Sequence, residues 1–401
     1  MTNTERFFIN IVSSYISGKK PQTPDGIDYS ELLLLAHIHK LLPVVYSSLK
    51  TNFNDGETVN FINKIKKAAI AQVAGQAVKC KKFMEVCSAI NEKSIKYASL
   101  KGTVLGSLYP EPDLRLSSDE DILATGADFD KAAAVLIEAG FEMRESENGE
   151  SNVSPFYDKD SGLLIELHRS LFSDRFLIGQ KMCGFYDGAA ERYESIYIDN
   201  CKISILSPTD ALLYLILHSF KHFIRCGFGI RQITDFILFA KSKAGSTNAE
   251  YIISSLKEVN ALGFFDCILK ICEEYFDASK DDLGFSSYTP SETDPSNMIA
   301  DVISGGAYGN SSPERVHSSL ITLLSVESGK KESFISALFP PYDIMKTKYP
   351  IVARSRLFLP LGWTKRIITK LLRRKKSFDT SETVEIGKRR VAMLKEYGVI
   401  E

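Results

Sequence analysis

Two aspartates, Asp119 and Asp121, lie two positions apart in the strand-like segment DEDILAT and constrain the fold more than any other feature of the chain. Because residues i and i+2 project from the same face of a strand, both carboxylates are directed to one side of a sheet. Two neighbouring carboxylates repel each other, and both stay ionised only if a cation lies between them. A third carboxylate, Glu166, lies in the later strand-like segment LLIELH. The sequence therefore predicts a sheet that holds these three acids around Mg²⁺, which prefers oxygen ligands and often shares them with substrate phosphates.

The spacing of apolar residues divides the chain into three parts. Residues 1–94 have helical spacing, and residues 95–206 mix short strand-like runs with helical runs, which is typical of an α+β domain. Residues 207–401 return to helical patterns, which include long runs over 208–225, 229–243 and 248–276. We therefore expect a small mixed-sheet α+β domain, flanked by a helical N-terminal region and a helical C-terminal domain.

The turn Lys101-Gly102-Thr103 lies between a strand-like run and a short helical run. A glycine in such a turn lets a phosphate approach the backbone closely. The amides at the helix start, the Thr103 hydroxyl and the Lys101 ammonium can then bind its oxygens. The alternative for Lys101 is a surface lysine at a strand end.

Two residues near the acids have a functional and a structural interpretation. Arg115 could bind phosphate through both arms of its guanidinium, or form a structural salt bridge to Asp113 or Glu111. His168 shares a strand face with Glu166, so it could orient that carboxylate or touch the acceptor, or simply have a structural role.

Further along the chain, local spacing favours structural interpretations. His218 and His222 have a spacing that suits zinc, but no Glu follows His218 in an H-E-x-x-H pattern, so packing or a nucleotide-pocket edge is favoured. Arg231 and Asp235 predict an ion pair on one helix face. The glycines of GGAYG at 305–309 lack the context of a dinucleotide loop and favour a flexible turn.

At these residues the sequence resembles the DNA polymerase beta-like nucleotidyltransferase superfamily. Its pattern is a Gly-Ser-type turn, then Asp-x-Asp or Asp-x-Glu, then a later acid on a strand. More narrowly, the chain resembles the bacterial group usually described as nucleotidyltransferase family proteins. The resemblance rests on LKG at 100–102, Tyr109-Pro110, Arg115, DEDIL at 119–123 and ELH at 166–168.

The resemblance implies an NTP donor, two Mg²⁺ ions and transfer of a nucleoside monophosphate to an acceptor. At matching positions, Asp119 and Asp121 would bind both metals. Glu166 would bind the catalytic metal and help to deprotonate the attacking hydroxyl. Gly102 and Thr103 would form the phosphate-binding turn.

The sequence departs from the superfamily pattern in the turn and between the two aspartates. Thr103 stands where Ser is commoner, which keeps the hydroxyl. Glu120 replaces the apolar residue usually found between the acids, and the gap from Gly102 to Asp119 is longer than in many members. A glutamate at position 120 would face the core side of the sheet, which costs energy unless it is paired or sits at the strand end.

Composition bears on partners and compartment. The formal net charge of −1 argues against long nucleic acid as a partner, because such proteins usually carry a basic excess. The seven cysteines include no CxxC pair and favour reduced thiols in a cytosol. No apolar stretch approaches the roughly 20 residues that a membrane-spanning helix needs, so we expect a cytoplasmic protein.

Three functions follow as alternatives. The first is transfer of a nucleotidyl group to a hydroxyl of a small molecule, a glycan precursor or a protein. The second is a catalytically silent protein that binds nucleotide or a partner, and the third is a phosphotransferase or toxin–antitoxin component. The presence of all three carboxylates favours catalysis.

The basic segment 361–376 raises a separate question of partners, because it contains seven Lys or Arg residues and no acid. Such an amphipathic run could lie on an anionic membrane surface or line the nucleotide cleft. Packing of its apolar stripe on the helical domain is the favoured alternative.

Overall fold

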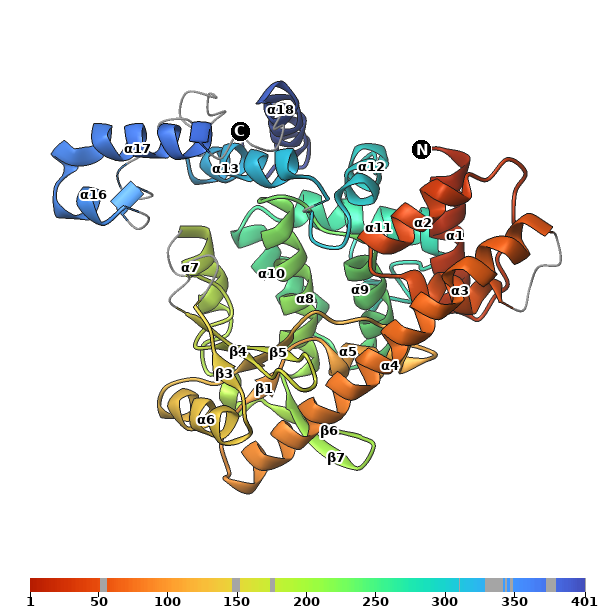
Figure 1. Ribbon diagram of the computed structural model, residues 1–401, viewed down its shortest axis with the longest axis horizontal. Helices are drawn as coiled ribbons and strands as arrows, with labels where there is room; N and C mark the ends of the chain where they lie inside the picture. The colour runs from red at the N-terminus through yellow and green to blue at the C-terminus, as the bar shows by residue number, and fades with distance from the viewer. Residues whose placement is uncertain are drawn as a thin grey trace.

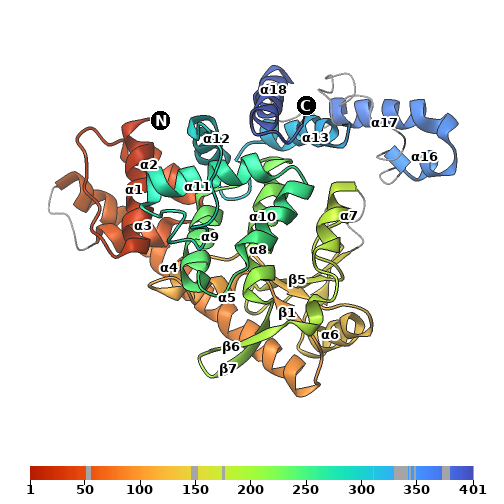
Figure 2. The same cartoon turned by 180° about the vertical axis from the view of Figure 1, so that it is seen from behind.

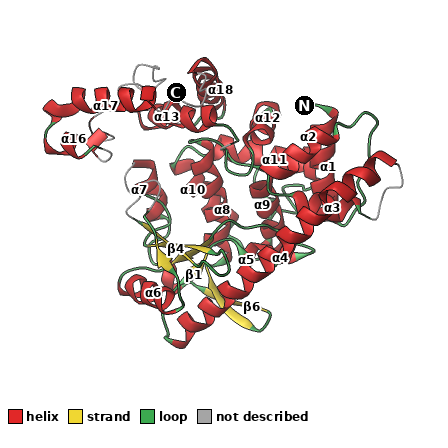
Figure 3. Cartoon of the chain, viewed as in Figure 1, coloured by secondary structure: helices red, strands yellow, loops and turns green. Residues whose placement is uncertain are grey.

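A computed structural model describes residues 1–50, 56–145, 152–173, 177–309, 311–328, 342, 345–346, 349–372 and 380–400. It contains one seven-stranded mixed sheet with helices on both sides and long helical regions before and after it, which confirms the predicted α+β class (Figures 1 and 3).

The N-terminal region is helical, as its apolar spacing predicts. It consists of α1 (Asn3–Ser17), α2 (Tyr29–Ile38), α3 (Leu42–Leu49) and the long α4 (Gly56–Glu92). The first helix begins with a capping box between Thr2 and Glu5, which satisfies amides that the first turn leaves without partners. Its apolar face, including Phe8 and Ile11, is fully buried. Helix α4 continues from this group of helices and runs along the sheet (Figure 1).

The strands form a sheet in the order β3-β4-β5-β2-β1-β7-β6. They are β1 (Ala98–Ser99), β2 (Glu120–Leu123), β3 (Glu142–Met143), β4 (Val153–Tyr157), β5 (Leu164–His168), β6 (Glu194–Ile198) and β7 (Cys201–Ile205). Strand β2 pairs parallel with β5, and β1 pairs parallel with β7, while the remaining neighbours are antiparallel. Between the strands lie α5 (Thr103–Gly106), η1 (Pro112–Leu114), α6 (Ala127–Glu138), α7 (Leu177–Gly184) and η2 (Ala189–Glu191).

The two faces of the central strands have different surroundings. Ile122 of β2, with Ile165 and Leu167 of β5, belongs to a buried cluster that also contains apolar residues of α4 and α6. Because side chains alternate along a strand, Asp121 and Glu166 project from the opposite face. That face is turned toward the helical region that follows the sheet.

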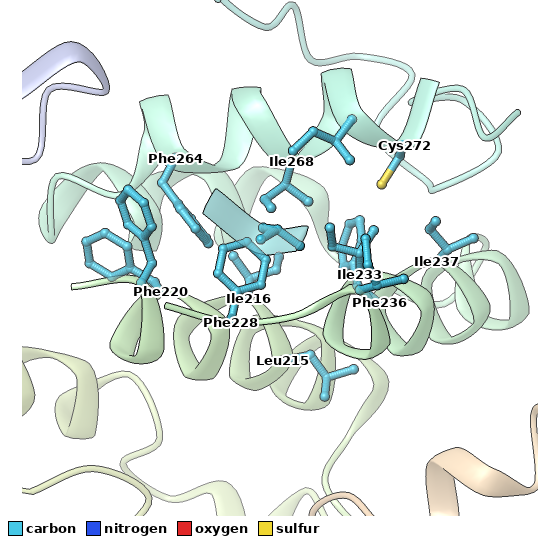
Figure 4. Close-up of a cluster of buried hydrophobic side chains, with 14 of the residues drawn as sticks. Leu215, Ile216, Phe220, Phe228, Ile233, Phe236, Ile237, Phe264, Ile268 and Cys272 are labelled. Atoms are coloured by element: carbon cyan, nitrogen blue, oxygen red, sulfur yellow. The ribbon is translucent and has the colours of Figure 1, made fainter. Parts of the chain in front are cut away.

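Helices α8 (Pro208–Phe223), α9 (Ile230–Lys243), α10 (Ala249–Glu258) and α11 (Leu262–Phe276) form the main body of the second helical region. Aromatic and aliphatic side chains from α8, α9 and α11 interdigitate between these helices (Figure 4). The helical pattern over 248–276 is interrupted at Val259–Ala261, where Asn260 adopts a left-handed conformation with φ of 54°. A residue with left-handed backbone angles ends a helix, so two helices form where the periodicity alone predicts one.

The last part of the described chain contains α12 (Ser296–Gly305), α13 (Pro313–Ser328), α16 (Pro350–Arg354), η3 (Arg356–Phe358), α17 (Leu359–Leu372) and α18 (Thr380–Glu396). A buried ion-pair cluster joins three of these helices. Asp301 of α12 lies 2.6 Å from Arg315 of α13 and also pairs with Arg390 of α18.

Helices α16 and α17 lie at one end of the molecule, as both ribbon views show (Figures 1 and 2). The start of the basic segment 361–376 lies in α17, but residues 373–376 and the side chains of 366–372 lie outside the described residues. The predicted basic amphipathic surface there stays a prediction. Among the described helices, none has the length and apolar character to cross a membrane.

Candidate active site

Neighbouring strands bring two of the predicted acids together. In the parallel register of β2 and β5, Asp121 lies directly opposite Glu166, and His168 lies two residues further along β5 on the same face. One ligand atom from each of these three residues lies within 4.8 Å of the other two. Two carboxylates and an imidazole at this spacing could hold a divalent metal ion.

The Asp121 carboxylate is the most buried part of this group, with 2% of the residue exposed. One of its oxygens lies 3.0 Å from the Lys101 ammonium, and the other lies 2.9 Å from Nε2 of His168. Burial alone would raise the pKa of Asp121, but Lys101 and His168 outweigh it and hold the pKa below its usual value. Asp121 is therefore a permanent anion at the centre of the group.

Glu166 is half-buried, and its carboxylate lies 3.7 Å from Nε2 of His168. Burial and the neighbouring charges of Asp121 and Asp119 raise the pKa of Glu166 to about 7. This carboxyl group therefore resists ionisation because it is beside other anions. A divalent cation between Asp121 and Glu166 would remove that repulsion, so the donor set fits the metal that the sequence predicts.

Asp119 lies one residue before β2 and is half-buried. It lines the same pocket as Asp121, and Ser117 donates a hydrogen bond to its backbone carbonyl. Its carboxylate is not part of the compact group formed by Asp121, Glu166 and His168. The structure thus places all three predicted acids in one region and brings oxygen atoms of Asp121 and Glu166 within 4.8 Å of each other.

The predicted phosphate-binding turn is closed by a side chain of the protein. The backbone amide of Thr103 donates to both carboxylate oxygens of Glu120, at 3.0 and 2.9 Å, and the Thr103 hydroxyl donates to one of them. Gly102 adopts a φ of 61°, and a Cβ at this position would lie 1.9 Å from the Glu120 carboxylate. Only glycine permits this approach.

Glu120 therefore lies where the turn would otherwise receive an anion. It is 1% exposed, and burial raises the pKa of Glu120 to about 8 despite the hydrogen bonds from Thr103. The expected cost of a buried glutamate is offset by these donors. Thr103 faces Glu120 and α4, whereas Lys101 and Gly102 line the pocket.

Arg115 forms a buried structural salt bridge. Its Nε and Nη2 donate to the two carboxylate oxygens of Asp235, both at 2.7 Å, and Nη1 donates to the Gly102 carbonyl at 3.1 Å. The Tyr109 hydroxyl donates to the same carboxylate at 2.8 Å. The partner is neither Asp113 nor Glu111, because the folded chain places a residue 120 positions away at this guanidinium. The predicted pair between Arg231 and Asp235 is replaced by this contact.

A pocket opens between the sheet and the helices that follow it. The sheet region contributes Lys101, Gly102, Arg115, Ser117, Asp119 and Asp121 to its lining. The helical region contributes Leu215, His218, Ser219, Arg231, Gln232, Asp235 and Tyr308.

The two histidines of α8 lie at the edge of this pocket or next to it. Nε2 of His218 lies 3.3 Å from the Lys101 ammonium, and the His218 and His222 rings meet edge to face. Burial and nearby cations hold the pKa of both histidines below its usual value. His218 is therefore a neutral acceptor for Lys101, in agreement with the favoured packing and pocket-edge interpretation.

Tyr308 is a pocket residue that sequence reasoning missed. The glycine-containing turn GGAYG positions it, because Gly309 approaches the Cys226 carbonyl so closely that a Cβ would lie 2.3 Å from the oxygen. The same segment that favoured a flexible turn is thus packed tightly against the α8–α9 connection. The glycines were the available signal, since close backbone approach is one of the two reasons for a glycine in a turn.

Comparison with known proteins identifies the family of the chain. The family described as "Uncharacterised nucleotidyltransferase" matches residues 25–277, which is more than half of the chain. None of the curated proteins matches the chain significantly. Among solved structures, the chain is similar to an antigenic nucleotidyltransferase-like protein from Paracoccidioides brasiliensis, with 16% sequence identity and a TM-score of 0.32 over 50% of this chain and 94% of that one.

Proposed function

Because this chain belongs to the family of uncharacterised nucleotidyltransferases, we propose that it transfers a nucleoside monophosphate from an NTP to a hydroxyl group of a small molecule, a glycan precursor or a protein. Family membership supports nucleotidyl transfer in general. The proposal of a metal-dependent transfer to a hydroxyl rests on one observation. Asp121 and Glu166 lie opposite each other on β2 and β5, and Asp121 lines a pocket.

The proposed metal ligands are Asp121 and Glu166, with Asp119 at the edge of the same pocket. A bound divalent cation would supply charge neutralisation for the triphosphate and lower the pKa of a nearby hydroxyl. The protein's own residues orient these ligands. Nε2 of His168 lies 2.9 Å from Asp121 and 3.7 Å from Glu166, so it orients the Asp121 carboxylate and lies beside the Glu166 carboxylate.

In this proposal Lys101 positions the Asp121 carboxylate and contacts a phosphate of the NTP. Its ammonium lies between the Asp121 carboxylate and Nε2 of His218, and the attraction of Asp121 holds the pKa of Lys101 well above its usual value despite burial. A permanent cation at this position neutralises Asp121 while no metal is bound. A metal ion bound at Asp121 would take over that neutralisation, and the Lys101 ammonium would then be available to a phosphate oxygen.

Glu166→Gln tests the proposal more specifically than a substitution of Asp121 would. Glu166 is half-buried, and its substitution leaves the Asp121–Lys101 pair intact. We expect Mg-NTP binding to persist and pyrophosphate release across a panel of hydroxyl acceptors to fall by orders of magnitude, since the side chain loses its charge and basicity. Glu138→Gln, the same change on the exposed face of α6, is the matched control.

Asp121→Asn should abolish both Mg-NTP binding and turnover, while also lowering stability, because it leaves Lys101 without its carboxylate.

Unaltered pyrophosphate release by Glu166→Gln would remove Glu166 from the mechanism. NTP binding by the wild type without transfer to any acceptor would instead support the catalytically silent alternative.

A further inference from the structure

Arg231 is a buried cation in the wall of the pocket opposite the acids. It is the second residue of α9 and is 5% exposed. Its Nη1 donates to the Leu116 carbonyl at 2.5 Å, and its Nη2 donates to the Tyr308 hydroxyl at 2.7 Å. Its Nε is buried and has no hydrogen-bond acceptor among the described residues.

Arg231 forms no direct ion pair within the described residues, although Tyr308 and the more distant Asp235 carboxylate outweigh burial and raise the pKa of Arg231 above its usual value. The nearest acid along the helix is Asp235, but both of its oxygens accept hydrogen bonds from Arg115. No carboxylate of the described residues lies within ion-pair distance of Arg231. Burial of a guanidinium without a directly paired carboxylate is unfavourable, so such a group is often found where a ligand of opposite charge binds.

Hydrogen bonds through Tyr308 and Ser118 connect Arg231 with a second cation, Lys40. The Tyr308 hydroxyl accepts from Arg231 and donates to the Ser118 hydroxyl at 3.1 Å. The Lys40 ammonium also bonds to Ser118 and lies 4.9 Å from the centre of the Tyr308 ring. Burial and the Asp119 carboxylate raise the pKa of Tyr308, yet Arg231 and Lys40 outweigh them and leave the pKa below its usual value. The potential at this wall therefore favours negative charge.

The other pocket groups that could bind a phosphate already have partners within the described chain. Of the cations that line it within the described chain, Lys101 is paired with Asp121 and Arg115 with Asp235. The amide and hydroxyl of Thr103, where a phosphate-binding turn is expected, are occupied by Glu120. Arg231 is thus the pocket cation whose charge has no carboxylate partner within the described residues.

We propose that Arg231, together with Tyr308, forms an anion-binding subsite that receives a phosphate group, in place of the turn that Glu120 closes. The inference deepens the proposed function, on which it rests, by assigning the phosphate contact to α9 and the turn after α12. Arg231 and Tyr308 do not contact the proposed metal ligands Asp121 and Glu166 directly, so the subsite can be tested without metal and without turnover.

The test uses inorganic pyrophosphate as the probe, in EDTA, with the full chain and isothermal titration calorimetry. Wild-type protein is expected to bind pyrophosphate, and Arg231→Gln to bind it about tenfold to a hundredfold more weakly, which corresponds to the loss of a charge-assisted hydrogen bond. Arg231→Lys, which keeps the charge but not the planar fork, should be intermediate. Lys241→Gln removes an exposed cation from the far end of the same helix and should match the wild type.

Wild-type protein that does not bind pyrophosphate, or Arg231 variants that bind it as tightly as the wild type, would overturn the subsite. Should Arg231→Gln fail to fold, the Arg231→Lys comparison decides alone. The source of the phosphate is settled by competition. In a second titration, with excess Mg²⁺ in place of EDTA, displacement of pyrophosphate by Mg-NTP assigns the subsite to the donor, and simultaneous binding of both assigns it to a phosphorylated acceptor.

The two proposals fail separately. Pyrophosphate binding through Arg231 without any nucleotidyl transfer would leave the subsite and refute the enzymatic function. Transfer whose KM for NTP and for acceptor is unchanged in Arg231→Gln would leave the function and refute the subsite.

Discussion

His39 makes the folded protein sensitive to acid in a way that can be calculated from its contacts. It is fully buried at the end of α2, where Nε2 lies 3.0 Å from the Ile303 carbonyl and Nδ1 lies 3.4 Å from the backbone amide of Ile230. These partners require a neutral ring that donates from Nε2 and accepts at Nδ1, because a protonated Nδ1 would point a hydrogen at the Ile230 N–H. Burial, with a contribution from Arg231, lowers the pKa of His39 from 6.5 to about 4.

The sign and size of the effect follow from proton linkage. Between pH 6.5 and about 4 the unfolded chain binds a proton at His39 and the folded chain does not, so stability falls as the pH falls through that window. Each tenfold change in proton affinity corresponds to about 1.4 kcal/mol, so the full loss is about 3 kcal/mol. Of this, about 2 kcal/mol is lost between pH 8 and pH 5.

Comparison of the wild type with His39→Gln isolates this contribution, because the glutamine can still donate to the Ile303 carbonyl but does not titrate. Other buried groups with shifted pKa values, such as Glu120 and Glu166, are present in both proteins and cancel in the difference. Urea unfolding at pH 8 and pH 5 should show that the wild type loses about 2 kcal/mol more than the variant. His37→Gln, which removes an exposed histidine from the same helix, should follow the wild type.

An NMR titration of the His39 ring provides the independent check. A ring that titrates near 6.5 in the folded protein, or equal losses of stability in wild type and His39→Gln, would refute the reasoning. Either result would mean that the imidazolium is accommodated at this position, and that the two backbone contacts do not select the neutral ring.

Two substitutions test other parts of the structure by their effect on stability. Asp235→Asn should destabilise the fold by about 3–5 kcal/mol in urea unfolding, because it leaves the buried Arg115 without its counterion, and a loss below about 1 kcal/mol would contradict the assigned pair. Gly102→Ala should lower the free energy of unfolding by more than about 2 kcal/mol, since a Cβ would displace the Glu120 carboxylate and force a residue with a positive φ. Gly75→Ala in α4, where a Cβ meets no neighbour, is the control and should stabilise the protein by roughly 1 kcal/mol.

Prediction from the sequence was most successful where a short-range pattern carries the information. The period of two along a strand predicts which residues share a face. In the structure Asp121 and Glu166 lie opposite each other on neighbouring strands, on the same face of the sheet. Helical spacing predicted α1, α4, α8 and α9 for the same reason, since burial of one face requires that spacing. The division into 1–94, 95–206 and 207–401 stays a prediction about independent units.

Long-range charge pairing was decided only by the tertiary structure. Arg115 and Asp235 are 120 positions apart, and no local spacing relates them. Short-range spacing instead predicted that Arg115 pairs with Asp113 or Glu111, and that Arg231 pairs with Asp235. A buried ion pair is chosen by which groups lose water together when the elements pack, and that depends on the whole fold.

The sequence by itself thus determined an α+β chain with three acids assigned to a sheet, and it identified the glycine turn beside them. Only the tertiary structure decided that Glu120 fills that turn and that Arg231 is left without a carboxylate. The physical reason is that strand and helix periods act between residues close in the chain. Whether a polar group is satisfied depends instead on which distant donors and acceptors are buried with it.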